Sequence, residues 1–137
     1  MQSFAESGRT GHNVVGVTPG WFRSYIVVGA YFDGLGTLDG AFYPGADSNA
    51  SGVAALLDLA RELASACDDR TGIIFVAFDG HNADLAGSRA FLERFRREYR
   101  ISLMVNLDIL GSSMAPLHKN QADYLIALGA NPWRREL

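Results

Sequence analysis

The sequence predicts one three-layer αβα domain of the α/β class, with a mostly parallel central sheet. Two uninterrupted apolar runs, Tyr25–Ala30 and Ile73–Phe78, have strand length and are typical of strands buried on both faces. After each run lies a stretch whose apolar residues recur at three- and four-residue steps, as on one face of a helix. Strands that alternate with helices in this way favour parallel pairing with helices on both faces.

Further strands are expected on both sides of these two runs. Asn13–Val17 is a β-branched segment closed by the turn pair Pro19-Gly20, and Leu103–Leu107 and Tyr124–Leu128 are apolar runs later in the chain. Residues 1–12 are polar and contain glycine, so we expect a flexible lead there.

The two helical stretches each present an apolar face to the expected sheet. Ser51 is expected to cap the first helix with its side chain. The predicted inner face of the first helix consists of Val53, Leu56, Leu57, Ala60, Leu63 and Ala64. The predicted inner face of the second consists of Leu85, Ser88, Leu92, Phe95 and Tyr99.

The end of the sequence carries the signals that begin a helix. Asn131 is a good cap and Pro132 suits the first helical position, yet the sequence stops at Leu137. We therefore expect residues 1–137 to form a single, partial domain whose C-terminal part is absent.

Composition excludes several classes of function. The 12 basic and 15 acidic residues give a net charge of -3, and no basic run would attract a phosphate backbone, so nucleic acid is not an expected partner. The apolar runs are far shorter than the roughly 20 residues of a membrane span. Cys67 is the single cysteine, so no intrachain disulfide is expected.

The functional site is expected beyond the carboxyl ends of the strands, where parallel α/β sheets bind their ligands. The stretch Asp33–Asn49 is rich in glycine, aspartate and aromatic residues and has no apolar periodicity. It is predicted to be a long loop, and long loops in compact domains tend to carry function.

Four segments at these strand ends resemble those of metallopeptidase family 28, the co-catalytic zinc aminopeptidases. They are Gly29-Ala30-Tyr31-Phe32-Asp33, Pro44-Gly45-Ala46-Asp47-Ser48-Asn49-Ala50-Ser51-Gly52, Asp79-Gly80-His81-Asn82 with Leu85-x-Gly87-Ser88, and Asn106-Leu107-Asp108. The resemblance extends from about Asn13 to Leu128 and keeps order and spacing. It implies the zinc-dependent exopeptidase-like (phosphorylase/hydrolase-like) fold and suggests a periplasmic or secreted location.

The resemblance also implies roles for individual positions, and most of them carry a different residue here. The family's first zinc histidine falls on Tyr31, its bridging aspartate on Ser48, its catalytic glutamate on His81 and a zinc glutamate on Asn82. Asp108 is the only zinc ligand retained. A phenol with a pKa near 10 is a weak ligand at neutral pH, and a hydroxyl does not bridge two cations as a carboxylate does.

These replacements lead to the expectation of a non-catalytic domain that binds a peptide or protein partner in the former substrate cleft. No cofactor is expected, and zinc would bind only if residues outside this chain rebuild the site. The alternative is an active metallopeptidase or hydrolase with an altered metal site. No metal and no turnover would favour the first hypothesis, and a tightly held ion the second.

Other arrangements of the same residues stay open at this point. His81 is either a new general base or ligand, or a solvated side chain. Ser48, His81 and Asp108 could form a hydrolase triad, although no Gly-x-Ser-x-Gly elbow surrounds Ser48.

A single-metal site could use Asp108 and His81 with Asp33 or Asp47, although these last two also suit turns and caps. In the family, the position of Asp33 orients the first histidine. The aromatic residues of this region form either a ligand-binding surface or the packing of the loop. They are Tyr31, Phe32, Phe42 and Tyr43.

Overall fold

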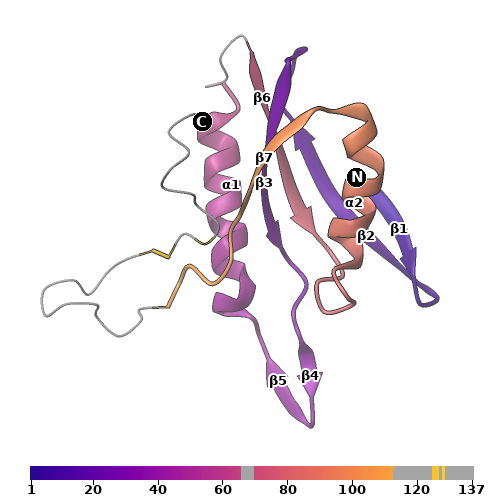
Figure 1. Cartoon of the computed structure of the whole chain (residues 1–137). Helices are drawn as coiled ribbons and strands as arrows, with labels where there is room; N and C mark the ends of the chain where they lie inside the picture. The colour runs from indigo at the N-terminus through magenta and orange to yellow at the C-terminus, as the bar shows by residue number, and fades with distance from the viewer. Residues whose placement is uncertain (66–69, 113–124, 127, 129–137) are drawn as a thin grey trace, which may run out of the picture.

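The computed structural model describes residues 1–65, 70–112, 125–126 and 128. It contains a five-stranded sheet with the order β1-β2-β6-β3-β7 (Figure 1). The strands β3 (Ser24–Tyr31), β6 (Thr71–Phe78) and β7 (Ile101–Asn106) are parallel to one another, whereas β1 (Gln2–Glu6) and β2 (Arg9–Val17) are antiparallel to their neighbours. The prediction of parallel strands therefore holds for the half of the sheet that carries the candidate site.

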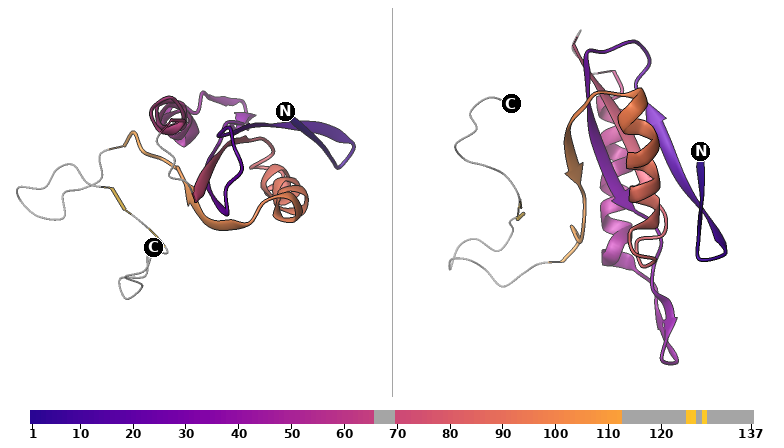
Figure 2. Two further views of the ribbon diagram at one scale, coloured as in Figure 1. Left: turned by 90° about the horizontal axis from the view of Figure 1, so that it is seen from above. Right: turned by 45° about the vertical axis from the view of Figure 1, so that its right-hand side comes forward.

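Two helices cover opposite faces of the sheet, which confirms the three-layer prediction. Viewed from above, α1 (Gly52–Leu63) and α2 (Ala86–Glu98) lie on either side of the strands (Figure 2). Side chains that alternate along β3 enter two separate cores. Val27 and Tyr31 pack with Phe91 and Phe95 of α2, while Val28 packs with Leu56 of α1.

The expectation of a flexible lead over residues 1–12 is wrong, because these residues form β1 and the first part of β2. A buried hydrogen-bond network fixes both strands to α2. The fully buried Asn13 Nδ2 donates to Gln2 Oε1 at 3.0 Å and to the Gly87 carbonyl at 2.8 Å. Gln2 Nε2 donates to the Ala90 carbonyl at 2.8 Å. Polar residues that bond one another inside the fold have no apolar pattern by which a sequence would reveal the strand.

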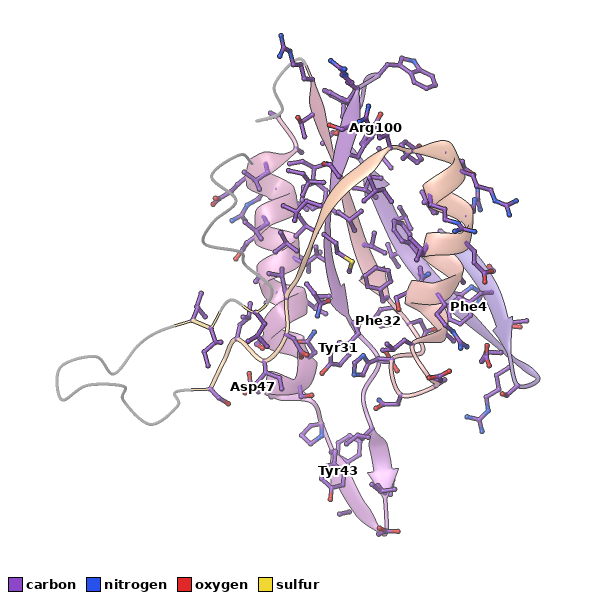
Figure 3. All side chains as sticks on the ribbon, viewed as in Figure 1. Phe4, Tyr31, Phe32, Tyr43, Asp47 and Arg100 are labelled. Atoms are coloured by element: carbon purple, nitrogen blue, oxygen red, sulfur yellow. The ribbon has the colours of Figure 1, made fainter. Side chains whose placement is uncertain are left out.

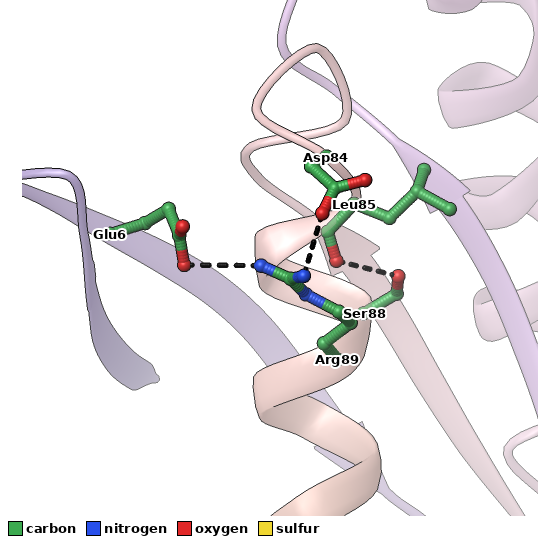
Figure 4. Close-up of polar contacts among 5 residues, drawn as sticks. All are labelled: Glu6, Asp84, Leu85, Ser88 and Arg89. Atoms are coloured by element: carbon green, nitrogen blue, oxygen red, sulfur yellow. Dashed lines mark hydrogen bonds and ion pairs between the residues drawn. The ribbon is translucent and has the colours of Figure 1, made fainter.

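The inner face of α2 agrees with the prediction at Phe95 and Tyr99 and differs elsewhere. Phe91 and Phe95 are buried together with Ala86 and Gly87, whereas Leu85 and Leu92 are exposed. At the surface Arg89 pairs with Asp84 at 2.7 Å and with Glu6 of β1 at 3.2 Å (Figure 4). Exposed ion pairs of this kind stabilise a fold by less than about 1 kcal/mol. Burial of Phe91 and Phe95 against the sheet, where Phe91 meets Phe78 of β6 edge to face, therefore contributes more than these salt bridges to holding α2 in place.

The inner face of α1 also differs in part from the prediction, because Leu57 is exposed. The side chains of α1 that pack on the sheet are Val53, Leu56, Leu59, Ala60 and Leu63. The predicted loop over residues 33–49 contains a hairpin of β4 (Gly36–Leu38) and β5 (Ala41–Tyr43). Its turn residues Asp39 and Gly40 both have positive φ, 51° and 79°. This is the geometry that Asp-Gly favours in two-residue hairpins.

On its outer side β7 has no strand partner in the described part of the chain, and its residues from Ser102 to Asn106 are exposed. Of the strand predicted over residues 124–128, Leu125, Ile126 and Leu128 are described and are not in a strand, while the other two residues lie outside the described part. The helix predicted from Asn131 lies outside it entirely. Among the helices that the structure describes, none has the length and apolar character to cross a membrane.

Candidate functional site

The four segments singled out in the sequence meet at the carboxyl ends of β3, β6 and β7, next to the start of α1. Tyr31 is the last residue of β3, and Ser48 lies in the turn Ala46–Ser51 that precedes α1. His81 follows β6 and Asp108 follows β7. Figure 3 shows Tyr31, Phe32 and Asp47 at this end of the sheet.

Tyr31 and Ser48 form the centre of the site. The Tyr31 Oη and Ser48 Oγ atoms lie 2.8 Å apart and share a hydrogen bond. Burial raises the pKa of the Tyr31 phenol above its usual value near 10, the Ser48 hydrogen bond acts in the opposite direction, and Asp108 and Asp33 raise the pKa further. Tyr31 is therefore a neutral phenol at neutral pH.

His81 stacks flat on Tyr31, with ring centroids 3.7 Å apart and an interplanar angle of 9°. Its backbone N–H donates to Asp33 Oδ1 at 3.0 Å, and the Asn82 N–H donates to Asp33 Oδ2 at 3.4 Å. Asp33 thus fixes the loop after β6 and, through it, the position of the imidazole.

Asn49 joins the strand ends, a role that the sequence reasoning did not assign. Its Nδ2 donates to the carbonyls of Tyr31 at 3.2 Å and Leu107 at 3.0 Å, and its Oδ1 accepts the Ile109 N–H at 3.1 Å. Next to it, a Cβ on Gly52 would overlap the Leu107 carbonyl. The signal in the sequence for this role was Asn49, whose amide both donates and accepts hydrogen bonds, three residues before Gly52.

Ser51 and Asp47 hold the segment after β7. Ser51 does not cap α1 as predicted: its Oγ donates to the Asp47 carbonyl at 2.7 Å and accepts the Leu110 N–H at 3.0 Å. The Asp47 carboxylate accepts hydrogen bonds from Ser112, from the Gly111 N–H and from Ser51, which lower its pKa. Asp47 therefore stabilises the loop around it, in line with the interpretation that it serves a turn.

The residues present do not match the chemistry of a zinc pair. Within the described ranges, no three or more His, Cys, Asp or Glu side chains group as metal ligands. Zinc sites use imidazole, thiolate or carboxylate ligands, whereas a neutral phenol and a hydroxyl bonded to each other stand where the resemblance implies the first zinc histidine and the bridging carboxylate. Asp33 and Asp47 are each engaged with backbone N–H groups in separate loops, so the single-metal arrangement is not assembled either.

The serine, histidine and aspartate residues are not arranged as a triad. Ser48 Oγ is hydrogen-bonded to Tyr31 Oη, and the imidazole of His81 stacks on the phenol ring of Tyr31. A triad requires a hydrogen bond between the nucleophile and the imidazole. In the described part of the chain, the hydrogen bond that Ser48 makes is with the phenol.

A pocket of about 190 Å³ opens beside this cluster, between the hairpin and the start of α1. Its lining includes Phe32, Asp33, Pro44, Ser48, Asn49 and Val53. Of the four aromatic residues proposed as surface or packing, Tyr31 is buried, whereas Phe32 and Tyr43 are about half exposed and Phe42 is 72% exposed. Packing thus accounts for Tyr31 and not for the other three.

Comparison with known proteins yields consistent similarities. The profile of Peptidase family M28 matches residues 13–128. Aminopeptidase YwaD of Bacillus subtilis is 30% identical over 114 residues, covering 80% of this chain and 24% of that protein. Leucine aminopeptidase 1 of Metarhizium robertsii is 29% identical over 117 residues, covering 80% of this chain and 30% of that protein.

A solved structure shows the same fold. The crystal structure of Legionella LapA matches with a TM-score of 0.64 at 24% identity, covering 80% of this chain and 31% of LapA. The chain therefore spans between 24% and 31% of the length of these three proteins.

Proposed function

Because this chain belongs to peptidase family M28, we propose that it is a peptidase-like domain without hydrolytic activity that binds a peptide or protein partner in the cleft of that fold. The observation that carries the proposal is the hydrogen bond between Tyr31 Oη and Ser48 Oγ, with His81 stacked on the same phenol. These three residues stand where the resemblance implies a zinc histidine, a bridging carboxylate and a catalytic glutamate.

The chemistry of the cluster supports this proposal. Hydrolysis by a metal pair needs a bridging anion to hold both ions and a base to take the proton of the attacking water. Ser48 carries no charge, and Tyr31 keeps its proton at neutral pH because a phenol has a pKa near 10, which burial raises further here. Asp108 is the one carboxylate left at a position of the family's ligands, and one carboxylate does not hold two zinc ions.

The retained scaffold supports a binding role. Asn49 and Asp33 still fix the loops around the pocket, and the pocket itself is open beside the cluster. Concave sites lined by apolar and a few polar groups are the usual places of ligand binding.

Zinc content and turnover test the proposal together. The protein is dialysed against micromolar zinc, its zinc is measured by elemental mass spectrometry, and hydrolysis of leucine 4-nitroanilide is followed. We expect far less than one zinc ion per chain and no turnover, with Aminopeptidase YwaD as the positive control for hydrolysis. The same measurements are repeated on a protein that continues past Leu137.

One or two tightly held ions, with turnover that a chelator abolishes, would instead establish the alternative of an active metallohydrolase with an altered site. Such a result with only the longer protein would mean that residues beyond this chain complete the metal centre. Near-zero zinc and no turnover in both proteins would support the non-catalytic hypothesis, in which the domain binds a peptide or protein partner.

A further inference from the structure

A group of exposed apolar side chains lies on the hairpin β4–β5 and on the segment that leads into it. We call this group the hairpin face; it consists of Phe32, Leu35, Leu38, Phe42 and Tyr43. The hairpin projects beyond the ends of α1 and the sheet (Figure 1), and Tyr43 lies further out than Tyr31 and Phe32 (Figure 3). Exposed apolar side chains concentrated on one projecting hairpin are typical of a binding surface.

The strand register spreads the aromatic rings over the hairpin. Phe42 pairs with Thr37 and Tyr43 pairs with Gly36, so the two rings lie on opposite faces of the two-stranded ribbon. Because Gly36 has no side chain, nothing on the opposite strand covers the Tyr43 ring from its own pair position. The pocket opens at the base of the ribbon, where Pro44 and Phe32 line it.

The segment that carries the hairpin face contains acidic residues and no basic residue. From Phe32 to Tyr43 the charged residues are Asp33 and Asp39. Further along the chain, Asp47 is bonded within its own loop, and Asp58 pairs with Arg61 at 3.1 Å. Asp39 is at the tip of the hairpin, and Asp33 lines the pocket at its base. The faces of aromatic rings are also negative in potential, so rings and carboxylates favour the same kind of ligand.

We propose that the hairpin face and its pocket bind a peptide segment that carries arginine or lysine side chains. This proposal rests on the part of the proposed function that concerns peptide binding. A guanidinium stacks on an aromatic ring and at the same time pairs with a carboxylate, and this surface offers both within one hairpin. The carbon stems of the same side chains cover the apolar groups between the rings.

The selectivity of the face is measured with two peptides labelled for fluorescence anisotropy. One is Gly-Ser-Arg-Arg-Ser-Gly, acetylated and amidated, and the other has citrulline in place of both arginines, which keeps shape and hydrogen bonding but removes the charge. Blocked ends exclude binding through a terminal amine. We expect the arginine peptide to bind at least about tenfold more tightly, and its affinity to fall as salt rises.

Matched variants locate the binding. Phe42→Leu keeps the apolar bulk but removes the ring, and Asp39→Asn keeps the left-handed turn conformation but removes the charge. Each should weaken the arginine peptide by about two- to fivefold and leave the citrulline peptide unchanged. The controls are Trp21→Ala, which removes a ring that is 96% exposed away from the hairpin, and Asp58→Asn, which removes an exposed carboxylate of α1.

Equal affinity for both peptides, or an equal loss with Asp58→Asn and Asp39→Asn, would overturn the proposal. So would a dimer that forms through the hairpin face and excludes the peptide, since its occupant would then be a second copy. The proposed function is judged separately by zinc and turnover: its failure with arginine selectivity intact would make the hairpin face a substrate-recognition surface, and the loss of selectivity alone would leave the non-catalytic domain standing.

Discussion

Tyr31 shows how a single side chain changes what a strand end can do. Its phenol lies among buried side chains and bonds Ser48, and burial is the main reason why its pKa is raised. A group whose pKa is higher in the folded state loses its proton first in the unfolded state. The stability that it contributes is therefore complete below the usual pKa near 10 and decreases as pH rises through the folded value.

This linkage can be measured with Tyr31→Phe. At neutral pH we expect the variant to lose about 1 kcal/mol of unfolding free energy, because the hydrogen bond with Ser48 is removed. Above about pH 10 the stability of the unchanged protein should decline more steeply, so the gap between the two should shrink. Urea unfolding at several pH values gives both quantities. Parallel curves, or the same behaviour in the exposed control Tyr43→Phe, would contradict the assignment.

Asn49 is the second residue on which the site depends. Asn49→Ala leaves the Tyr31 and Leu107 carbonyls and the Ile109 N–H without their partner. We expect a loss of about 2 to 4 kcal/mol in unfolding free energy, measured by urea unfolding. Asn82→Ala, at an exposed position of the neighbouring loop, is the control and should cost well under about 1 kcal/mol. Equal losses would mean that the Asn49 bonds are not the reason.

At the scale of elements, close packing joins α2 to the sheet. A Cβ on Gly87 would overlap the Asp79 carbonyl oxygen and Asn13 Oδ1, whereas a Cβ on Gly16 of β2 would meet nothing within 4 Å. Gly87→Ala should therefore cost about 3 kcal/mol or prevent folding, while Gly16→Ala should be neutral or slightly stabilising. Thermal unfolding followed by circular dichroism compares the two. A tolerated Gly87→Ala would show that α2 can shift away from Asn13.

The elements that the sequence could predict are those with a strong apolar pattern. β3 and β6 are nearly continuous apolar runs and were expected within two residues of their bounds. β1 is held by side-chain amides and by strand pairing, which leave no such pattern. On α2 the apolar spacing predicted Phe95 and Tyr99 correctly but favoured Leu92 over the neighbouring Phe91, whose larger ring is the one buried against Phe78.

The site was predictable in position but not in arrangement. The resemblance located Tyr31, Ser48 and His81 at converging strand ends, yet which side chains pair depends on tertiary geometry that no spacing encodes. The hydrogen bond to Tyr31 and the stack of His81 were not foreseen. Asp39-Gly40 is a turn signal typical of hairpins, but the strands beside it are only three residues long and have no apolar alternation that would predict them.

At the scale of the whole molecule, metal and stability should be uncoupled. A ligand that binds only the folded state stabilises it, by about 2.7 kcal/mol when the ligand concentration is a hundred times the dissociation constant. The unfolding temperature rises as a consequence. Because no three His, Cys, Asp or Glu side chains group as metal ligands among the described residues, we expect added zinc or a chelator to change the midpoint by less than about 1 °C. Magnesium at equal concentration is the ionic control. An increase of several degrees with zinc alone would contradict the proposal.

The bonds of Asn49 have a consequence for the order of folding. They join residues separated by 58 and 60 positions in the chain, and contacts of long separation become favourable only after most of the chain is arranged. The pocket rim should therefore close late, together with the pairing of β3 and β7, whose partners are 76 or 77 positions apart. A stopped-flow probe at the rim that lags behind overall helix formation would show it, and a ligand captured only at that late stage would report that folding is complete.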